Sequence, residues 1–157
     1  MAESNQNNWS LMPSILTNPL INPGPAAIQN AREYFTEMLA IRNDSTLFRL
    51  RSGQDVIDRL AFYNVGPQQQ PGLIAMSIDG QNPRPYRGAK YKRVVVFFNV
   101  DKVAKNLTID AMRGKLLLPH PIHWFSRSDP LPRSASFNRT TGGFSIPARS
   151  TVVFIEP

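Results

Sequence analysis

The chain contains no cysteine, and only two of its 157 residues are histidines. The absence of cysteine excludes disulfide frameworks, thiolate zinc sites, iron–sulfur clusters and cysteine nucleophiles. The chain also lacks a run of about 18 apolar residues. Its first ten residues, MAESNQNNWS, lack the positive charge and the apolar stretch of a signal peptide. We therefore expect neither a membrane-spanning helix nor a membrane partner.

Charged residues are also scarce, at 18% of the chain, whereas hydrophobic residues make up 41%. This composition favours a packed core over a disordered coil. The length is typical of one ordinary domain and is too short for a complete barrel enzyme of roughly 250 residues. Fourteen prolines and nine glycines favour many short elements separated by turns.

The charge that is present is basic, with 18 Lys and Arg against 11 Asp and Glu, a net charge of +7. The basic residues are spread along the chain, and the densest group lies in a loop rich in proline and glycine: Arg84, Arg87, Lys90, Lys92 and Arg93. No helix-turn-helix, zinc-finger or RNA-recognition pattern accompanies this charge. We therefore interpret the excess as solvated surface and expect no nucleic-acid partner.

The N-terminal third of the chain differs in pattern from the rest. Residues 1–25 are rich in Asn, Pro and Ser, which predicts an irregular lead-in. Residues 26–43 then carry apolar side chains at spacings of three and four, which predicts an amphipathic helix with Pro25 in its first turn. The apolar positions of this helix are Ile28, Ala31, Phe35, Met38, Leu39 and Ile41.

After residue 51 the apolar pattern is that of β-strands. Ser52 and Asp55 have the spacing of a helix cap, so a single helical turn is expected there. Strands are then predicted at 59–64, 73–79, 91–100, 107–112 and 115–118, around Phe137 and Phe144 on either side of a Thr-Thr-Gly-Gly turn, and at 150–156. The predicted fold is therefore mainly β, an antiparallel β-sandwich of about seven or eight strands preceded by one amphipathic helix. The predicted domains are 1–51 and 52–157.

The two histidines, His120 and His123, lie three residues apart in the segment Pro-His-Pro-Ile-His-Trp. On a helix this spacing suits a metal, but we expect Pro119 and Pro121 to prevent a helix at this point. No Asp or Glu lies within five residues of the pair to complete a ligand set. The sequence therefore predicts polar residues at the end of a strand, and neither a metal site nor a cofactor.

The acidic residues do not form a recognisable catalytic pair. Glycoside hydrolysis needs two carboxylates about 5 to 9.5 Å apart across a cleft. Glu33 and Glu37 lie one turn apart on the polar face of the predicted helix, and we interpret them as surface charges that pair with arginines. The chain also lacks a recognisable arrangement of Ser, His and acid, and a glycine loop long enough for phosphate. We therefore predict no catalytic residue and no enzyme activity for this chain.

Exposed aromatic rings offer a second interpretation. Flat aromatic side chains that stack on sugar rings are common in carbohydrate-binding modules. Trp124, Tyr86 and Tyr91 are the residues of this chain that we expect to contact sugar, if any do. Most phenylalanines fall within apolar runs, where core packing accounts for them. A carbohydrate-binding module therefore stays open as the alternative function.

Several segments of the chain occur in an order that matches a known family. The most specific are His120-Pro121-Ile122, Ser128-Asp129-Pro130, residues 135–138 (ASFN) and residues 144–154 (FSIPARSTVVF). With residues 31–51 and 62–79, they resemble the C-terminal region of pullulanase and limit dextrinase-type debranching enzymes, of the alpha-amylase superfamily. His123 stands where that family often has glutamine, a departure confined to local contacts.

This resemblance implies a position next to a catalytic barrel. In such enzymes the barrel carries the catalytic residues and ends in a helix, an all-β sandwich follows, and the whole enzyme cleaves α-1,6 branch points in glucans. Residues 5–9 would then resemble the end of the last barrel loop. The resemblance implies a structural, non-catalytic domain whose partner is the barrel. Relatives are secreted or at the cell surface in bacteria and in the plastid in plants, so the compartment of this chain stays open.

The resemblance also assigns a partner to the apolar face of the predicted helix. Ile28, Phe35, Met38 and Leu39 would face the barrel. Without a barrel these side chains need another apolar surface, because exposing them costs free energy. We therefore expect the helix to fold back onto the sandwich or to pair with a second copy in a homodimer.

Overall fold

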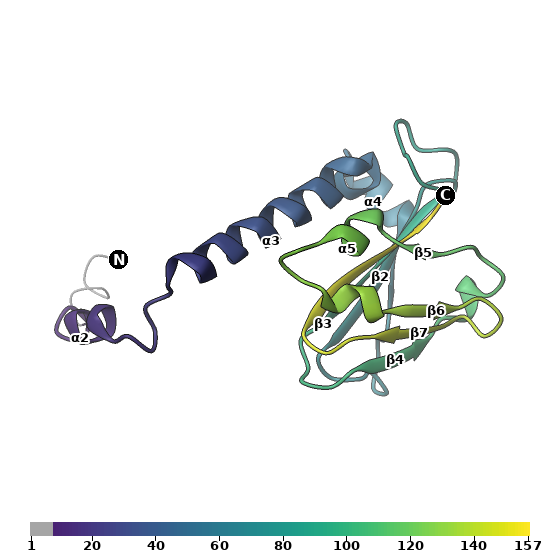
Figure 1. Ribbon diagram of the computed structural model, residues 1–157. Helices are drawn as coiled ribbons and strands as arrows, with labels where there is room; N and C mark the ends of the chain where they lie inside the picture. The colour runs from purple at the N-terminus through teal and green to yellow at the C-terminus, as the bar shows by residue number, and fades with distance from the viewer. Residues whose placement is uncertain (1–7) are drawn as a thin grey trace.

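The computed structural model describes residues 8–157, so residues 5–7 of the predicted barrel loop lie outside the described part (Figure 1). The helices are α2 (Met12–Thr17), α3 (Pro25–Asp44), η1 (Thr46–Arg49), α4 (Gly53–Arg59), η2 (Asp110–Met112), α5 (Pro121–Phe125) and η3 (Leu131–Ser134). The strands are β1 (Leu60–Tyr63), β2 (Leu73–Asp79), β3 (Arg93–Asn99), β4 (Lys105–Thr108), β5 (Leu118–Pro119), β6 (Ser136–Asn138), β7 (Gly143–Ile146) and β8 (Ser150–Glu156).

The strands form two antiparallel sheets. One sheet has five strands in the order β1-β2-β3-β8-β5, and the other has three in the order β4-β7-β6. The prediction of a mainly β, antiparallel fold is confirmed, and the arrangement of the sheets fits a sandwich. The central strands β2, β3 and β8 pair over their full seven-residue lengths.

The core between the two sheets is built around phenylalanines in tilted and edge-to-face contact. Phe97 of β3, Phe144 of β7 and Phe154 of β8 have ring centroids 4.8 to 6.0 Å apart. Alternating side chains of the large sheet meet those of the small one, as the period of two in a strand requires. The buried residues of this cluster are Leu73, Ala75, Val95, Phe97, Ile109, Met112, Leu117, Ala135, Phe144, Ile146, Val152 and Phe154.

The outer face of the five-stranded sheet carries a second core. Ile41 at the end of α3 and Leu47 of η1 cover this face. Strand β3 is therefore buried on both faces, which accounts for its unbroken run of valines and phenylalanines. The buried residues of this second cluster are Ile41, Leu47, Ile78, Tyr91, Val94, Val96, Val153 and Ile155. Both Ile41 and Leu47 precede residue 52, and the division of the chain at that residue stays a prediction.

Three short helices lie where the sequence predicted other structure. Helix α2 forms within the lead-in that was predicted to be irregular, with a proline near its start. Helix α5 begins at Pro121, so the prediction that the prolines prevent a helix is wrong. A proline in the first turn costs no hydrogen bond, because that N–H has no partner within the helix. Strand β4 ends at Thr108, and η2 replaces the rest of the predicted strand.

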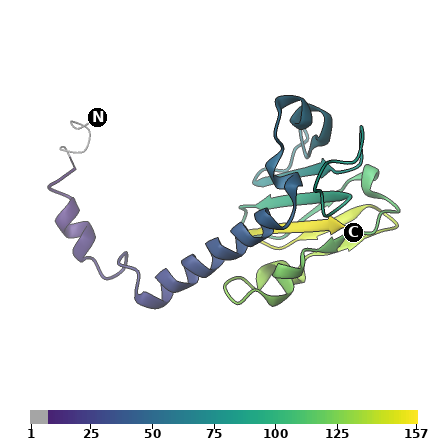
Figure 2. The same ribbon diagram turned by 90° about the horizontal axis from the view of Figure 1, so that it is seen from above.

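Helix α3 projects from the sandwich, and only its C-terminal end packs against it (Figure 2). Ile41 is the only buried residue of the helix. The expectation that the helix folds back onto the sandwich is therefore wrong, because the outer sheet face is already covered by the end of α3, η1 and α5. Between residues 8 and 157, no helix combines the length and the apolarity that a membrane span needs.

Candidate functional site

The surface that most needs a partner is the apolar stripe of α3. Ile28, Phe35 and Leu39 are 59%, 63% and 42% exposed, whereas Met38 is partly buried against the second core. Spacings of seven and four residues place the three exposed side chains on one face of the helix. The residues predicted to face the barrel therefore lie together, and all but Met38 are without cover in the described part of the chain.

Helix α2 and the turns around it extend this apolar surface. None of the residues of α2 is buried. Together with the stripe of α3 they form what we call the apolar arm, residues 8–40, which ends at the far side of the molecule from the sandwich (Figure 1). The other large exposed side chains of the arm are Trp9, Leu11, Met12, Ile15, Leu16, Leu20 and Ile21.

The last turns of α3 are held to the sandwich by polar contacts, which we call the helix junction. Glu37 accepts hydrogen bonds from the hydroxyls of Ser126 and Ser128 at 2.6 and 2.7 Å, and from the Arg127 N–H at 3.3 Å. Partial burial raises the pKa of Glu37, but these donors outweigh it, so the pKa lies below its usual value. The prediction that Glu37 pairs with arginine is wrong, because the loop after α5 supplies its donors.

Asp44, the last residue of α3, is the second contact of the helix junction. Its carboxylate accepts hydrogen bonds from Lys90 Nζ at 2.6 Å, from the Tyr91 hydroxyl and from His120 Nε2 at 3.1 Å. Partial burial raises the pKa of Asp44, but the three donors outweigh it and lower the pKa. The end of α3 is thereby bonded both to the loop before β3 and to the residue before α5.

The two histidines join α5 to the sheet. His120 Nδ1 accepts from the Ile122 N–H at 3.3 Å, and His123 Nε2 accepts from the Val153 N–H at 3.0 Å. Both rings are buried. Burial, together with repulsion from His120 when that ring is protonated, lowers the pKa of His123 to about 4. They are therefore neutral structural residues inside the fold. His120 directly follows β5, as predicted for the end of a strand, whereas His123 lies within α5. Among residues 8–157, no group of three or more metal-ligating side chains is found.

The three aromatic residues predicted to contact sugar lie in different environments. Tyr91 is only 6% exposed and bonds to Asp44, so the prediction for Tyr91 is wrong: a buried ring cannot stack on a sugar. Tyr86 is partly buried, and the guanidinium of Arg59 lies 4.8 Å from its ring centroid. Trp124, on α5, is 52% exposed. Trp124 is thus the one of the three with a largely free ring.

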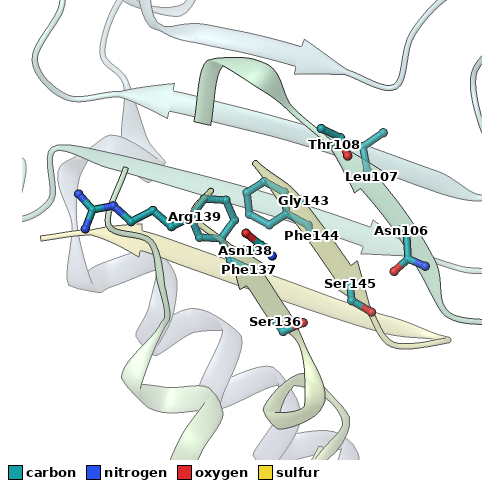
Figure 3. Close-up of a pocket in the computed structure, with 10 residues that line it drawn as sticks. All are labelled: Asn106, Leu107, Thr108, Ser136, Phe137, Asn138, Arg139, Gly143, Phe144 and Ser145. Atoms are coloured by element: carbon teal, nitrogen blue, oxygen red, sulfur yellow. The ribbon is translucent and has the colours of Figure 1, made fainter. Parts of the chain in front are cut away.

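A shallow hollow of about 660 Å³ lies over the three-stranded sheet (Figure 3). Asn106, Ser145 and Ser136 are paired in register across β4, β7 and β6, with Thr108 and Asn138 in the next row. Their side chains are small, polar and uncharged, and the residues between them, such as Phe144, point into the core. The alternation of polar and apolar residues along each strand could have predicted one polar face per strand. Only the pairing register shows that the three polar faces lie side by side.

The family comparison covers the whole chain. The model of the family "Alpha-1,6-glucosidases, pullulanase-type, C-terminal" matches residues 1–157. The chain is 33% identical over 156 residues to pullulanase 1, chloroplastic, of Arabidopsis thaliana. This match covers 97% of this chain and 16% of that protein. It is 27% identical over 131 residues to a pullulanase of Klebsiella pneumoniae. This second match covers 83% of this chain and 11% of that protein.

Solved structures of pullulanases share the fold. The match to the structure of PulA from Klebsiella oxytoca covers 86% of this chain and 13% of the PulA chain, at 26% identity and a TM-score of 0.75. The maltotriose complex of PulA from Klebsiella pneumoniae matches 86% of this chain and 14% of its own, at 27% identity and the same TM-score. The chain thus spans less than a fifth of the length of these relatives. It belongs to the pullulanase-type α-1,6-glucosidases and corresponds to their C-terminal domain.

Proposed function

We propose that this chain is a non-catalytic structural domain whose apolar arm packs on the catalytic barrel of a pullulanase-like enzyme, which hydrolyses α-1,6 branch points in glucans. The observation that carries the proposal is the apolar stripe of Ile28, Phe35 and Leu39, which is exposed on a helix anchored at one end. The relatives named pullulanase are several times longer than this chain, so the rest of their length has room for the catalytic region that such a stripe would contact.

The energetics favour a partner for the stripe. Burying a large apolar side chain contributes about 1.5 to 3 kcal/mol, and these three residues are roughly half exposed. Covering them completely would contribute on the order of 2 to 5 kcal/mol, a large share of the roughly 5 to 15 kcal/mol by which a domain is stable. The helix junction would hold the stripe in a defined position, so that docking costs little conformational entropy.

The placement of the acids supports a non-catalytic role. A glycosidase needs two facing carboxylates. The hollow over the small sheet has none, and the hollows beside Asp55 and Asp110 have one each. Glu37 and Asp44 are already engaged by donors of the fold. Incubation of the chain with pullulan is expected to release no reducing sugar, and turnover that persists through repurification would contradict this part of the proposal.

Hydrogen exchange on the chain, alone and with the catalytic region of a pullulanase relative that lacks its own C-terminal domain, tests the docking. In the isolated chain, amides of 25–36 should exchange rapidly and those of 38–44 slowly. Adding the catalytic region should protect 25–36 in the wild type but not in the variant Phe35→Ser/Leu39→Ser. The variant Asn30→Gln, changed at an exposed position on the opposite face of the same helix, is the control.

Light scattering on the same samples separates the two partners of the stripe. A monomer whose arm is protected only with the catalytic region supports docking on the barrel. Protection that appears in the chain alone and rises with its concentration, together with a doubled mass, would assign the stripe to a second copy. A monomer with a protected arm in the absence of any partner would contradict both.

Binding of α-glucan stays the second candidate function, and it rests on the exposed ring of Trp124. Calorimetry with maltooligosaccharides is expected to show binding heat that disappears in Trp124→Ala if this surface holds sugar. Heat that is unchanged in Trp124→Ala, or no heat in the wild type, would remove this candidate.

A further inference from the structure

A second feature, independent of the apolar arm, is a pocket of about 250 Å³ between α4 and the loop that follows β2. Four arginines and one aspartate line it, so the charge around it is strongly positive at neutral pH. We call it the arginine pocket. Its lining residues are Arg51, Asp55, Arg59, Arg84, Pro85, Tyr86 and Arg87.

Arg59 forms the structural floor of the arginine pocket. It is 5% exposed, and its guanidinium donates to the backbone carbonyls of Asp79, Asn82 and Arg84 at 3.2, 2.9 and 3.0 Å. Its Nε has no hydrogen-bond partner and lies 3.7 Å from the carboxylate of Asp55. A buried guanidinium with an unused donor leaves the floor of the pocket incompletely neutralised.

The backbone that carries the other arginines is held in place. The carbonyl of Arg84 accepts from Arg59, and the carbonyl of Arg87 accepts from the Thr46 hydroxyl at 3.1 Å. The Tyr86 N–H donates to the Gly80 carbonyl at 2.8 Å, which closes the loop. The positions from which the side chains of Arg84 and Arg87 emerge are therefore fixed before any ligand arrives.

The remaining guanidinium groups have no partner in the described part of the chain. Between residues 8 and 157, no carboxylate lies within 4.0 Å of the side-chain nitrogens of Arg51, Arg84 or Arg87, and these nitrogens donate no hydrogen bond. Asp55 accepts from the Ser52 hydroxyl at 2.7 Å and faces Arg59. Like charges gathered around one hollow repel each other, and a bound anion would relieve that repulsion.

We propose that the arginine pocket binds a phosphate monoester. Guanidinium groups match the oxygens of a phosphate with paired N–H donors. The arginines that line this pocket come from two segments, α4 with the residues before it and the loop after β2. The pocket volume exceeds that of a phosphate group alone, so the body of the ester, such as a sugar, would lie against the partly buried side chain of Tyr86.

Calorimetry at constant ionic strength tests this proposal on the 157-residue chain, with inorganic phosphate, glucose 6-phosphate, glucose and acetate as probes. Glucose 6-phosphate should bind, inorganic phosphate should bind at least as well as acetate, and glucose should not bind. Arg84→Gln/Arg87→Gln should weaken binding of glucose 6-phosphate by about tenfold or more, because two charge-assisted contacts are lost. Arg32→Gln/Arg127→Gln, which removes the same charge elsewhere, should leave binding within about twofold.

Circular dichroism and thermal unfolding in chloride establish that both double variants fold. Equal weakening in the two variants would overturn the proposal, because binding would then follow net charge and not the pocket. No binding of either phosphate compound to the folded wild type would overturn it as well, and so would acetate binding more tightly than phosphate. Tighter binding of glucose 6-phosphate than of inorganic phosphate supports recognition of the ester, whereas equal binding supports recognition of the phosphate group alone.

Discussion

The apolar arm and the sandwich use similar side chains and treat them differently. In the sandwich, Phe97 and Phe154 are fully buried between two sheets, whereas Phe35 in the arm is 63% exposed. Both regions follow the apolar period of their secondary structure. The difference shows that an apolar pattern indicates which side chains are stabilised by burial against another surface. The topology decides whether that surface belongs to the same domain.

The contrast also runs along α3 itself. Its last two turns carry Glu37, Met38, Ile41 and Asp44, which contact the sandwich, while its first three turns have no buried side chain. One continuous helix therefore links a packed domain to an unpartnered surface, and this suits an element shared between two domains.

The largest expected effect comes from removing equivalent rings in the two regions. Phe97→Ala should lower the free energy of unfolding by about 3 to 5 kcal/mol, because it leaves a cavity between the sheets. Phe35→Ala should change it by no more than about 0.5 kcal/mol in the isolated chain, because most of this ring is exposed. Urea unfolding measures both values. A loss of similar size in the two variants would show that the arm is packed in solution.

Acid should act on the sandwich through His123. The pKa of this histidine is lowered from 6.5 to about 4, so the unfolded chain takes up the proton first as the pH falls. Stability is complete above pH 6.5 and should be lost as the pH falls toward 4, by about 3 kcal/mol at pH 4. Urea unfolding across this range measures the loss. His123→Gln keeps an acceptor for the Val153 N–H and should flatten the dependence; an unchanged slope would contradict the assignment.

A smaller effect is expected at the helix junction. Glu37→Gln exchanges charge-assisted hydrogen bonds for neutral ones and should cost about 1 to 2 kcal/mol of stability. Amides at the end of α3 should also exchange faster. The matched control is Glu33→Gln, one turn earlier, whose carboxylate accepts only from Gln29 at 2.5 Å on the same helix. Identical values for the two variants would mean that the junction does not anchor the helix.

Much of the fold could be predicted from local patterns. The run of residues 73–79 corresponds to β2 residue for residue, the helix predicted at 26–43 is α3 within a residue at each end, and Ser52 caps α4 as expected. These features depend on neighbours within a few positions, which is the range over which periodicity and capping act. Helix α2 was missed because it has only six residues and lies among the asparagines and prolines that predicted an irregular lead-in.

The sites were less predictable, because their members come together only in space. Arg84 and Arg87 stood out as part of a basic loop, but Arg51 and Arg59 join them only through the packing of α4 beside that loop. Glu37 meets its serine donors about 90 positions later in the chain. Nothing in the spacing of residues indicates a contact over such a separation.

The sequence by itself determined helix α3 and the long central strands, the apolar stripe of α3 and the absence of cysteine chemistry, since each follows from residue identity or from neighbours along the chain. Only the tertiary structure decided that His120, His123 and Tyr91 are buried, that β3 is covered on both faces, and that the stripe stays exposed. The physical reason is that a side chain is buried only when another element packs over it. Which elements pack together depends on the strand order, and no pattern of neighbouring residues specifies that order.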